Sequence, residues 1–125
     1  MTVLIDSWTW IEYWKGGAYS RRAGQHIDGS ETAIMSTVNL AETYYWVLKH
    51  YGVDAAEQKK KTIARRCFLI PLDEEIAVNA AKTKRERKLG LADSIIIATG
   101  QAENARIVTG DPDFKGLQNV IYIGP

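Results

Sequence analysis

The feature that most constrains the fold is an alternation of short apolar runs with longer segments of helical periodicity. The clearest apolar runs, each bounded by turn residues, are 2–5, 106–108 and 120–123, and weaker ones are 33–35 and 68–72. Amphipathic helical patterns cover 8–14, 38–50, 55–66, 74–89 and 94–104. Short buried strands that alternate with helices predict the α/β class, with a short, mainly parallel sheet inside a three-layer α/β/α sandwich.

Size and composition are those of one ordinary globular domain, which we expect to span residues 1–125. The chain is 46% hydrophobic, its formal charge of +1 gives no sign of a polycation, and no repeat or linker divides it. The single cysteine, Cys67, excludes an internal disulfide and a cysteine-based zinc cluster, and it fits a reducing compartment. No apolar run approaches the roughly 18 residues that a membrane span requires. We therefore expect a soluble, cytoplasmic protein with no membrane partner.

Four acidic residues stand at positions where they could meet. Asp6 closes the first apolar run, and Asp111 comes soon after the run 106–108. Asp93 opens a helical segment, and Glu42 lies inside another. Because ligands of parallel sheets bind at the carboxyl ends of the strands, we expect Asp6 and Asp111 to share one edge of the sheet.

Each of these acids also has a purely structural explanation. Asp6 and Asp93 stand where helix N-caps occur, and an Asx-turn would account for Asp111 beside a proline. Glu42 lies roughly opposite the apolar stripe predicted for its helix, so periodicity alone makes it a solvated charge. That stripe consists of Leu40, Tyr44, Val47, Leu48 and Tyr51. Taken singly, none of the four acids indicates a catalytic site.

Taken together, the acids lie in four recognisable segments. These are the first apolar run with Asp6, then Asn39-Leu40-Ala41-Glu42-Thr43, Gly90-Leu91-Ala92-Asp93-Ser94-Ile95-Ile96-Ile97-Ala98-Thr99 and Thr109-Gly110-Asp111-Pro112-Asp113-Phe114. In this order they resemble the motifs of PIN-domain ribonucleases, and most of all the VapC toxins of prokaryotic toxin–antitoxin pairs. The resemblance covers essentially the whole chain, and the two late motifs are its specific part.

The resemblance implies a PIN-like α/β/α sandwich and a Mg²⁺- or Mn²⁺-dependent endoribonuclease. The matched positions are the catalytic acids Asp6, Glu42, Asp93 and Asp111 and the supporting residues Thr109 and Asp113. Hard divalent cations prefer carboxylate oxygens, and we expect Asp6, Asp93 and Asp111 to bind the metal. Glu42 would act directly or through bound water.

Two other functions deserve comparison with the nuclease. A catalytically silent PIN-like module would keep the fold and use its aromatic surface to hold a protein partner. An aspartyl phosphatase would also place an Asp after the first strand, but that chemistry generally needs a second Asp two residues later, where this chain has Trp8. Retention of all four acids favours the nuclease.

Basic and aromatic residues suggest the partners. We expect the cluster Lys84, Arg85, Arg87 and Lys88, which precedes the Asp93 helix, to contact the phosphates of the RNA substrate. All four tryptophans lie within the first 46 residues and belong either to the core or to an interface. The resemblance implies an antitoxin protein that binds near the early helices, and a homodimer of the toxin.

Overall fold

A five-stranded parallel sheet forms the centre of the molecule. The computed structural model describes residues 1–125. The strands are β1 (Thr2–Ile5), β2 (Thr32–Ser36), β3 (Phe68–Ile70), β4 (Arg106–Thr109) and β5 (Val120–Tyr122). They lie in the order β3-β2-β1-β4-β5, and every pair is parallel. All five predicted strands are present, the two weaker ones included, so the parallel sheet is confirmed.

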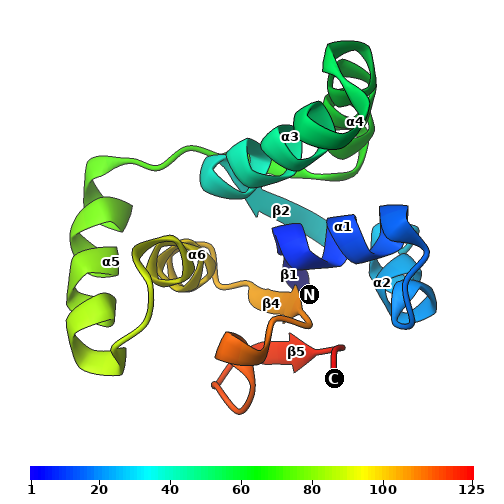
Figure 1. Ribbon diagram of the computed structural model, residues 1–125. Coiled ribbons are helices and arrows are strands. Elements are labelled where there is room, and N and C mark those ends of the chain that lie inside the picture. The colour runs from blue at the N-terminus through cyan, green and yellow to red at the C-terminus, as the bar shows by residue number, and fades with distance from the viewer.

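Helices cover both faces of this sheet (Figure 1). The α-helices are α1 (Ser7–Lys15), α2 (Ser20–Ile27), α3 (Thr37–Tyr51), α4 (Val53–Arg66), α5 (Glu74–Arg87) and α6 (Leu91–Ala102), and a short 3-10 helix, η1 (Pro112–Phe114), follows β4. Side chains alternate between the two faces along each strand. Val3 and Ile5 of β1 accordingly pack into a cluster with Trp10 of α1, whereas Leu4 packs with Ile96 of α6. The predicted three-layer α/β/α sandwich is confirmed.

The sequence pattern predicts no helix at α2 and only a turn at η1. Just two residues of α2, Ala23 and Ile27, are buried, and Gly24 lies between them. Such a segment lacks the repeated apolar positions from which an amphipathic helix is recognised. The 3-10 helix is too short to show periodicity at all.

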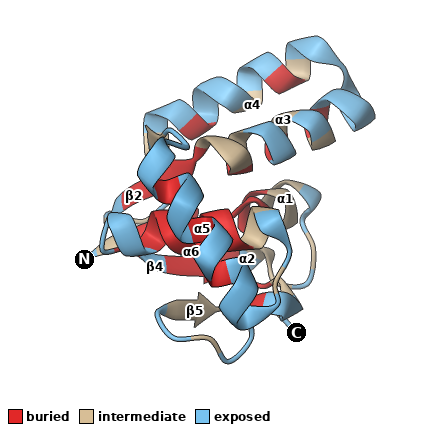
Figure 2. Ribbon diagram, turned by 90° about the vertical axis from the view of Figure 1, so that its left-hand side faces the viewer, coloured by how far each residue is buried: buried red, intermediate tan, exposed pale blue.

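Helices α3 and α4 form a hairpin that extends beyond the sheet (Figure 2). The apolar stripe predicted for α3 matches its buried face only in part, because Val47 is buried and Leu40 packs against the core. Its buried residues are Asn39, Thr43 and Val47, whereas Leu48 is 42% exposed and Tyr51 is 69% exposed. The distal half of α3 lies beyond the sheet, where its neighbours are α4 and Trp14 of α1, so aromatic and aliphatic side chains remain at the surface there.

The strand order fixes where a ligand can bind. From β1 the chain moves outward on one side to β2 and β3, and later returns to the other side as β4 and β5. Between β1 and β4 the connections diverge to opposite sides, and in parallel sheets the carboxyl ends of the strands at such a point are where ligands bind. None of the helices is both long and apolar enough to cross a membrane.

Candidate metal-binding site

The carboxyl ends of β1 and β4 bring the first and last acidic motifs together. Ile5 of β1 pairs with Val108 of β4, and the amide of Asp6 donates to the carbonyl of Val108 over 3.1 Å. Asp6 therefore lies beside the end of β4, which leads through Gly110 to Asp111. The prediction that Asp6 and Asp111 share this edge of the sheet agrees with the structure.

The Asp6 carboxylate is buried and held by two side chains. Asn39 of α3 donates its Nδ2 to Asp6 Oδ1 over 2.8 Å, and the Thr109 hydroxyl donates to Asp6 Oδ2 over 2.8 Å. Asp6 does occupy the N-cap position of α1, but its side chain makes no capping hydrogen bond. The capping explanation is therefore wrong for this carboxylate, whose orientation is set by α3 and β4.

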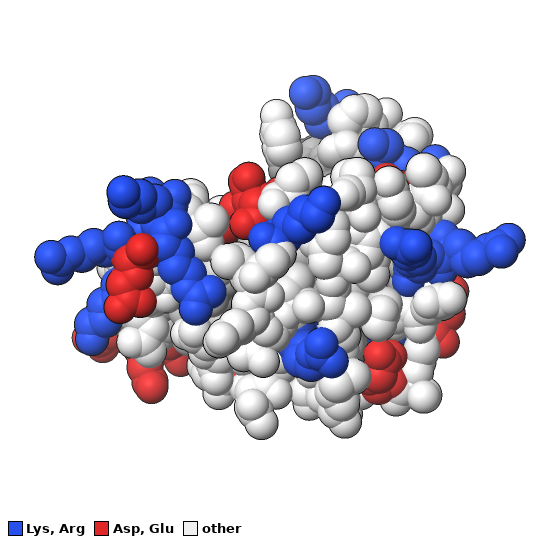
Figure 3. Space-filling model, turned by 90° about the horizontal axis from the view of Figure 1, so that it is seen from below, with Lys and Arg blue, Asp and Glu red and all other residues white.

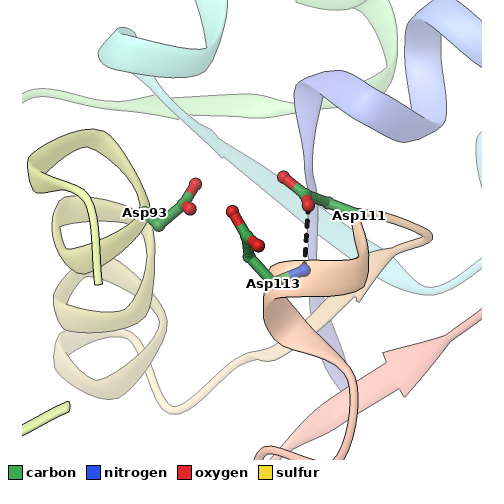
Figure 4. Close-up of side chains that lie close together, drawn as sticks. All are labelled: Asp93, Asp111 and Asp113. Atoms are coloured by element: carbon green, nitrogen blue, oxygen red, sulfur yellow. Dashed lines mark hydrogen bonds between the residues drawn. The ribbon is translucent and has the colours of Figure 1, made fainter. Parts of the chain in front are cut away.

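Three further carboxylates converge next to Asp6. Asp93, Asp111 and Asp113 each offer an oxygen, and these oxygens lie within 4.8 Å of one another. Figure 4 shows the three side chains directed toward a common point, with Asp93 on α6 facing Asp111, the N-cap of η1, and Asp113 within η1. The N-cap of α6 is Gly90, so Asp93 lies in the first turn and the capping explanation fails for it too. For Asp111 the Asx-turn is present as well, because Asp113 N donates to Asp111 Oδ1 over 3.0 Å.

Glu42 is exposed but not a free surface charge. The Ser7 hydroxyl donates to Glu42 Oε1 over 2.9 Å, and Asn39 Nδ2 approaches the same oxygen at 3.4 Å. These contacts tie Glu42 of α3 to the start of α1, directly after Asp6. Periodicity placed Glu42 on the solvated face of the helix, and it misses this tether because Asn39, three residues earlier on the same face, is polar.

Repulsion and burial make two of these acids hard to ionise. Burial raises the pKa of Asp6 to about 6, opposed by the hydrogen bond from Thr109 and reinforced by the charge of Glu42. The pKa of Asp93 is also raised to about 6, first by burial and then by the negative charges of Asp111 and Asp6. No Lys or Arg forms an ion pair with any of these acids. A bound cation would reduce the repulsion among these negative charges.

The sequence prediction does not include two residues of this site, Asn39 and Ser7. Asn39 is fully buried, and its Oδ1 has no hydrogen-bond partner. Its spacing of one helical turn from Glu42 puts both on one side of α3, and that spacing is the signal that could have identified it. A buried amide beside a carboxylate positions that carboxylate and needs a polar neighbour for its own oxygen.

The group as a whole offers only oxygen ligands. Carboxylate oxygens without histidine or cysteine are the donor set that Mg²⁺ and Mn²⁺ prefer. Asp113 belongs to the close group of three. Asp6 lies outside this group, but its negative charge is near enough to raise the pKa of Asp93. The structure thus gives Asp113, a supporting residue in the sequence prediction, a position as favourable for binding metal as that of Asp111.

The predicted basic cluster lies at the end of α5, and its members face different ways. Lys84 Nζ donates to the Leu89 carbonyl over 3.0 Å and so helps to end the helix. Lys88 occupies the C-cap with a left-handed backbone. Arg87 lines a cavity at the opposite end of β4 from the acids, where Arg106 begins that strand. The cluster therefore does not surround the carboxylates.

The aromatic residues are divided between the core and the surface. Trp10 is fully buried. Trp14 and Trp46, with Tyr51, line a cavity of about 270 Å³ among α1, α3 and α4. Tyr45, on the other hand, is 63% exposed. The core reading is therefore confirmed for Trp10, whereas the interface reading stays a prediction for the rings that border the open apolar cavity.

Comparison with known proteins agrees with this geometry. The family model described as PIN domain matches residues 3–119. A comparison with curated protein sequences gives no significant match. Among solved structures, a toxin–antitoxin complex from Klebsiella pneumoniae has a TM-score of 0.79 at 23% identity, with 95% of each chain covered.

Two further solved structures share the fold. VapBC2 from Rickettsia felis, bound to a DNA fragment from its promoter, has a TM-score of 0.76 at 20% identity and covers 100% of this chain and 99% of its own. VapC20 from Mycobacterium tuberculosis, a toxin that cleaves the sarcin-ricin loop, has a TM-score of 0.78 at 16% identity and covers 98% of this chain and 99% of its own.

Proposed function

Because the chain belongs to the PIN domain family, we propose that it is a metal-dependent endoribonuclease and the toxin of a toxin–antitoxin pair. The observation that carries this proposal is the convergence of Asp93, Asp111 and Asp113 beside the buried Asp6. Residues 1–125 would act as one cytoplasmic nuclease domain. Its substrate is RNA, and its reaction is hydrolysis of a phosphodiester bond.

The donor set fits Mg²⁺ or Mn²⁺. Asp6, Asp93 and Asp111 would hold the ion, and Asp113 is close enough to Asp93 and Asp111 to take part. A divalent cation supplies, when bound, a Lewis acid that makes water nucleophilic and neutralises charge on the scissile phosphate. Raised pKa values of about 6 at Asp6 and Asp93 support this proposal, because a cation would relieve the burial and repulsion that cause them.

The chain's own residues prepare the site for this chemistry. Asn39 and Thr109 donate to the two oxygens of Asp6 and hold its carboxylate in one orientation before any ligand arrives. Ser7 holds Glu42 at the rim of the site. An exposed carboxylate held in this way can orient a water molecule or accept its proton.

RNA contacts would come from the basic end of α5. Lys84, Arg85, Arg87 and Lys88 are all exposed there, and Figure 3 shows Lys and Arg side chains gathered over that end of the molecule, at the left of the view. Phosphate contacts of this kind supply most of the affinity that does not depend on sequence.

A protein partner would restrain the nuclease. The similar structures from Klebsiella pneumoniae and Rickettsia felis are complexes of a toxin with its antitoxin. In this chain the cavity bordered by Trp14, Trp46 and Tyr51 offers an apolar surface for an antitoxin segment. The exposed Tyr45 and Leu48 on α3 offer a surface that a second copy of the chain would cover in a homodimer.

The proposed function is tested by cleavage of single-stranded RNA. We expect the purified protein to cut RNA with Mg²⁺ or Mn²⁺ and to stop when a chelator is added. Asp93→Asn should reduce the rate by on the order of 10²-fold or more, because an acid at the metal is removed. Asp54→Asn is the matched control, since Asp54 is an exposed acid in the first turn of α4. Cleavage that persists in chelator, or that Asp93→Asn leaves unchanged, would contradict the proposal.

A further inference from the structure

A polar cavity lies at the amino end of β4, at the opposite end of this strand from the acids. It has a volume of about 240 Å³ and is lined by ten residues, none of which is acidic. Two arginines border it, Arg87 from the end of α5 and Arg106 from the start of β4. The remaining polar lining consists of the amide side chains Gln101, Asn104, Gln118 and Asn119.

Neither arginine has an acidic partner. The three ion pairs of the molecule involve other residues, and Arg106 makes only a 4.0 Å contact from Nη1 to the sulfur of Met1. Most surface arginines can be explained as solvated charges. Two guanidinium groups that border one cavity with no carboxylate among its lining residues, however, repel each other, and an anion between them would remove that repulsion.

The amide groups suit the same ligand, although two of them also have a local role. Asn104 and Asn119 have positive φ values of 50° and 59°, a conformation in which asparagine is favoured over most residues. Gln101 and Gln118 have no such backbone requirement. Their amides add hydrogen-bond donors beside the two guanidinium groups, the chemistry that binds phosphate oxygens.

This cavity and the acidic group lie at opposite ends of one seam. The seam runs between α6 and the connection from β4 to β5. At one end are Asp93 on α6 and Asp113 on the connection, and at the other are Gln101 on α6 and Gln118 on the connection. Ile97 of α6 and Phe114 of the connection belong to one apolar cluster, which joins the two sides of the seam.

The spacing of the two ends suits a short stretch of RNA. Asp93 and Gln101 are separated by about 12 Å along α6, at about 1.5 Å per residue. A few nucleotides of single-stranded RNA can span such a distance. The basic side chains of α5 border the same side of the molecule (Figure 3), so the electrostatic field there favours a polyanion.

From these observations we infer that the Arg87–Arg106 cavity binds a backbone phosphate of the RNA substrate, a few nucleotides away from the bond that is cut. This inference rests on the proposed function, because it assigns a second contact for the same substrate. A docking site for a protein is disfavoured, since only three of the ten lining residues are hydrophobic and interface cores are apolar and aromatic.

The experiment measures binding of a fluorescent single-stranded RNA in chelator, so that cleavage plays no part. The double variant Arg87→Gln, Arg106→Gln should bind about tenfold more weakly than the parent protein, and the slope of log affinity against log salt should decrease by about one. The matched control is Arg21→Gln, Arg22→Gln, which removes two exposed arginines from α2, a helix that takes no part in the cavity. Circular dichroism verifies that both variants fold.

A lysine pair distinguishes a phosphate site from a general charge effect. Arg87→Lys, Arg106→Lys keeps the charge but loses the planar fork, so the salt slope should be retained while affinity falls. Equal weakening by the two glutamine double variants would overturn the inference. Unchanged RNA binding by the Arg87→Gln, Arg106→Gln variant would overturn it too. If that variant bound RNA normally but no longer bound a polyglutamate probe, the cavity would be a site for an acidic protein instead.

Failure of this inference and failure of the proposed function give different results. A protein that cuts RNA with Mg²⁺ but binds it equally well without the two arginines loses only the second phosphate site. A protein that binds RNA through the two arginines and cuts nothing retains this site and loses the nuclease function.

Discussion

The Thr109 hydroxyl donates a 2.8 Å hydrogen bond to Asp6 Oδ2 across 103 residues of sequence. The same hydroxyl oxygen accepts from the amide of Asp111 over 3.1 Å. The buried Thr109 side chain thus orients both the carboxylate of Asp6 and the backbone of Asp111. Thr109 acts through these two aspartates, so it is a positioning residue.

Replacement of Thr109 by valine tests this role with little change in volume. Loss of the donor should raise the pKa of Asp6 further, because the hydrogen bond favours the ionised carboxylate. We expect RNA cleavage at neutral pH to fall about tenfold and the pH profile of the rate to shift toward higher pH. Thr109→Ser should restore both quantities. An unshifted profile in Thr109→Val would mean that the hydroxyl does not tune Asp6.

Asp6→Asn should separate activity from stability. The variant lacks a carboxylate at the site, so cleavage should fall by on the order of 10²-fold or more. The variant also no longer buries a carboxylate, whose pKa in the parent protein is about 6 because of burial. The unfolding free energy at neutral pH without metal should therefore not decrease. Urea unfolding in chelator measures the second quantity. Full cleavage by Asp6→Asn with metal present would remove Asp6 from the site.

The raised pKa values predict an unusual dependence of stability on pH. Asp6 and Asp93 titrate near pH 6 in the folded protein instead of 3.8, so the folded state binds protons more tightly than the unfolded chain. Without divalent metal, the unfolding free energy should therefore rise as pH falls from about 7 to about 5. The same contribution to stability is lost when pH rises through about 6, where the folded protein releases these protons. Asp6 contributes on the order of 1 to 3 kcal/mol, and half-buried Asp93 less because solvent screens it.

The measurement is urea unfolding in chelator at several pH values. Asp6→Asn should flatten the dependence, and Mg²⁺ at neutral pH should stabilise the parent protein by binding the folded state. A steady loss of stability on acidification from pH 7, with no rise, would contradict the raised pKa values.

Gly110 tests how closely the segment between Thr109 and Asp111 is packed. A Cβ at this position would overlap the ring of Trp8. The backbone of Gly110 also lies close to Gly124. Gly110→Ala should lower the unfolding free energy by about 1 to 3 kcal/mol and weaken metal binding, because Asp111 is displaced. Thermal unfolding and calorimetric titration with Mn²⁺ measure the two effects.

Gly90→Ala is the control for this substitution. Gly90 also precedes a site acid, but its φ is −62° and no atom lies within 4 Å of an added Cβ. It should therefore leave both measurements nearly unchanged. Equal effects of the two alanines would show that the contact with Trp8 is unimportant.

Much of the fold follows from the sequence because parallel strands buried on both faces are apolar throughout. The run before Asp6 and the run before Thr109 are recognisable without knowledge of their partners. The parallel arrangement then places their carboxyl ends at one edge, and it is this edge that joins Asp6 to Asp111.

Other parts of the site depend on contacts that no local pattern contains. Asn39 and Ser7 are ordinary polar residues in the sequence, and their importance arises only when α3 packs beside the start of α1. The direction of Arg87 could not be predicted either, because it depends on how α5 ends and crosses α6. Periodicity similarly misplaced part of the buried face of α3, since half of that helix lies beyond the sheet.

The pairing of the first strand with the fourth determines when the acidic site can form during synthesis. β1 is made at the start, yet its neighbour β4 begins at Arg106. A nascent chain that ends before this point lacks Thr109, Asp111 and the strand that aligns Asp6 with them. Nearly the whole chain must therefore be synthesised before the acids can assemble, and under the proposed function a chain that ends before Arg106 would not cleave RNA.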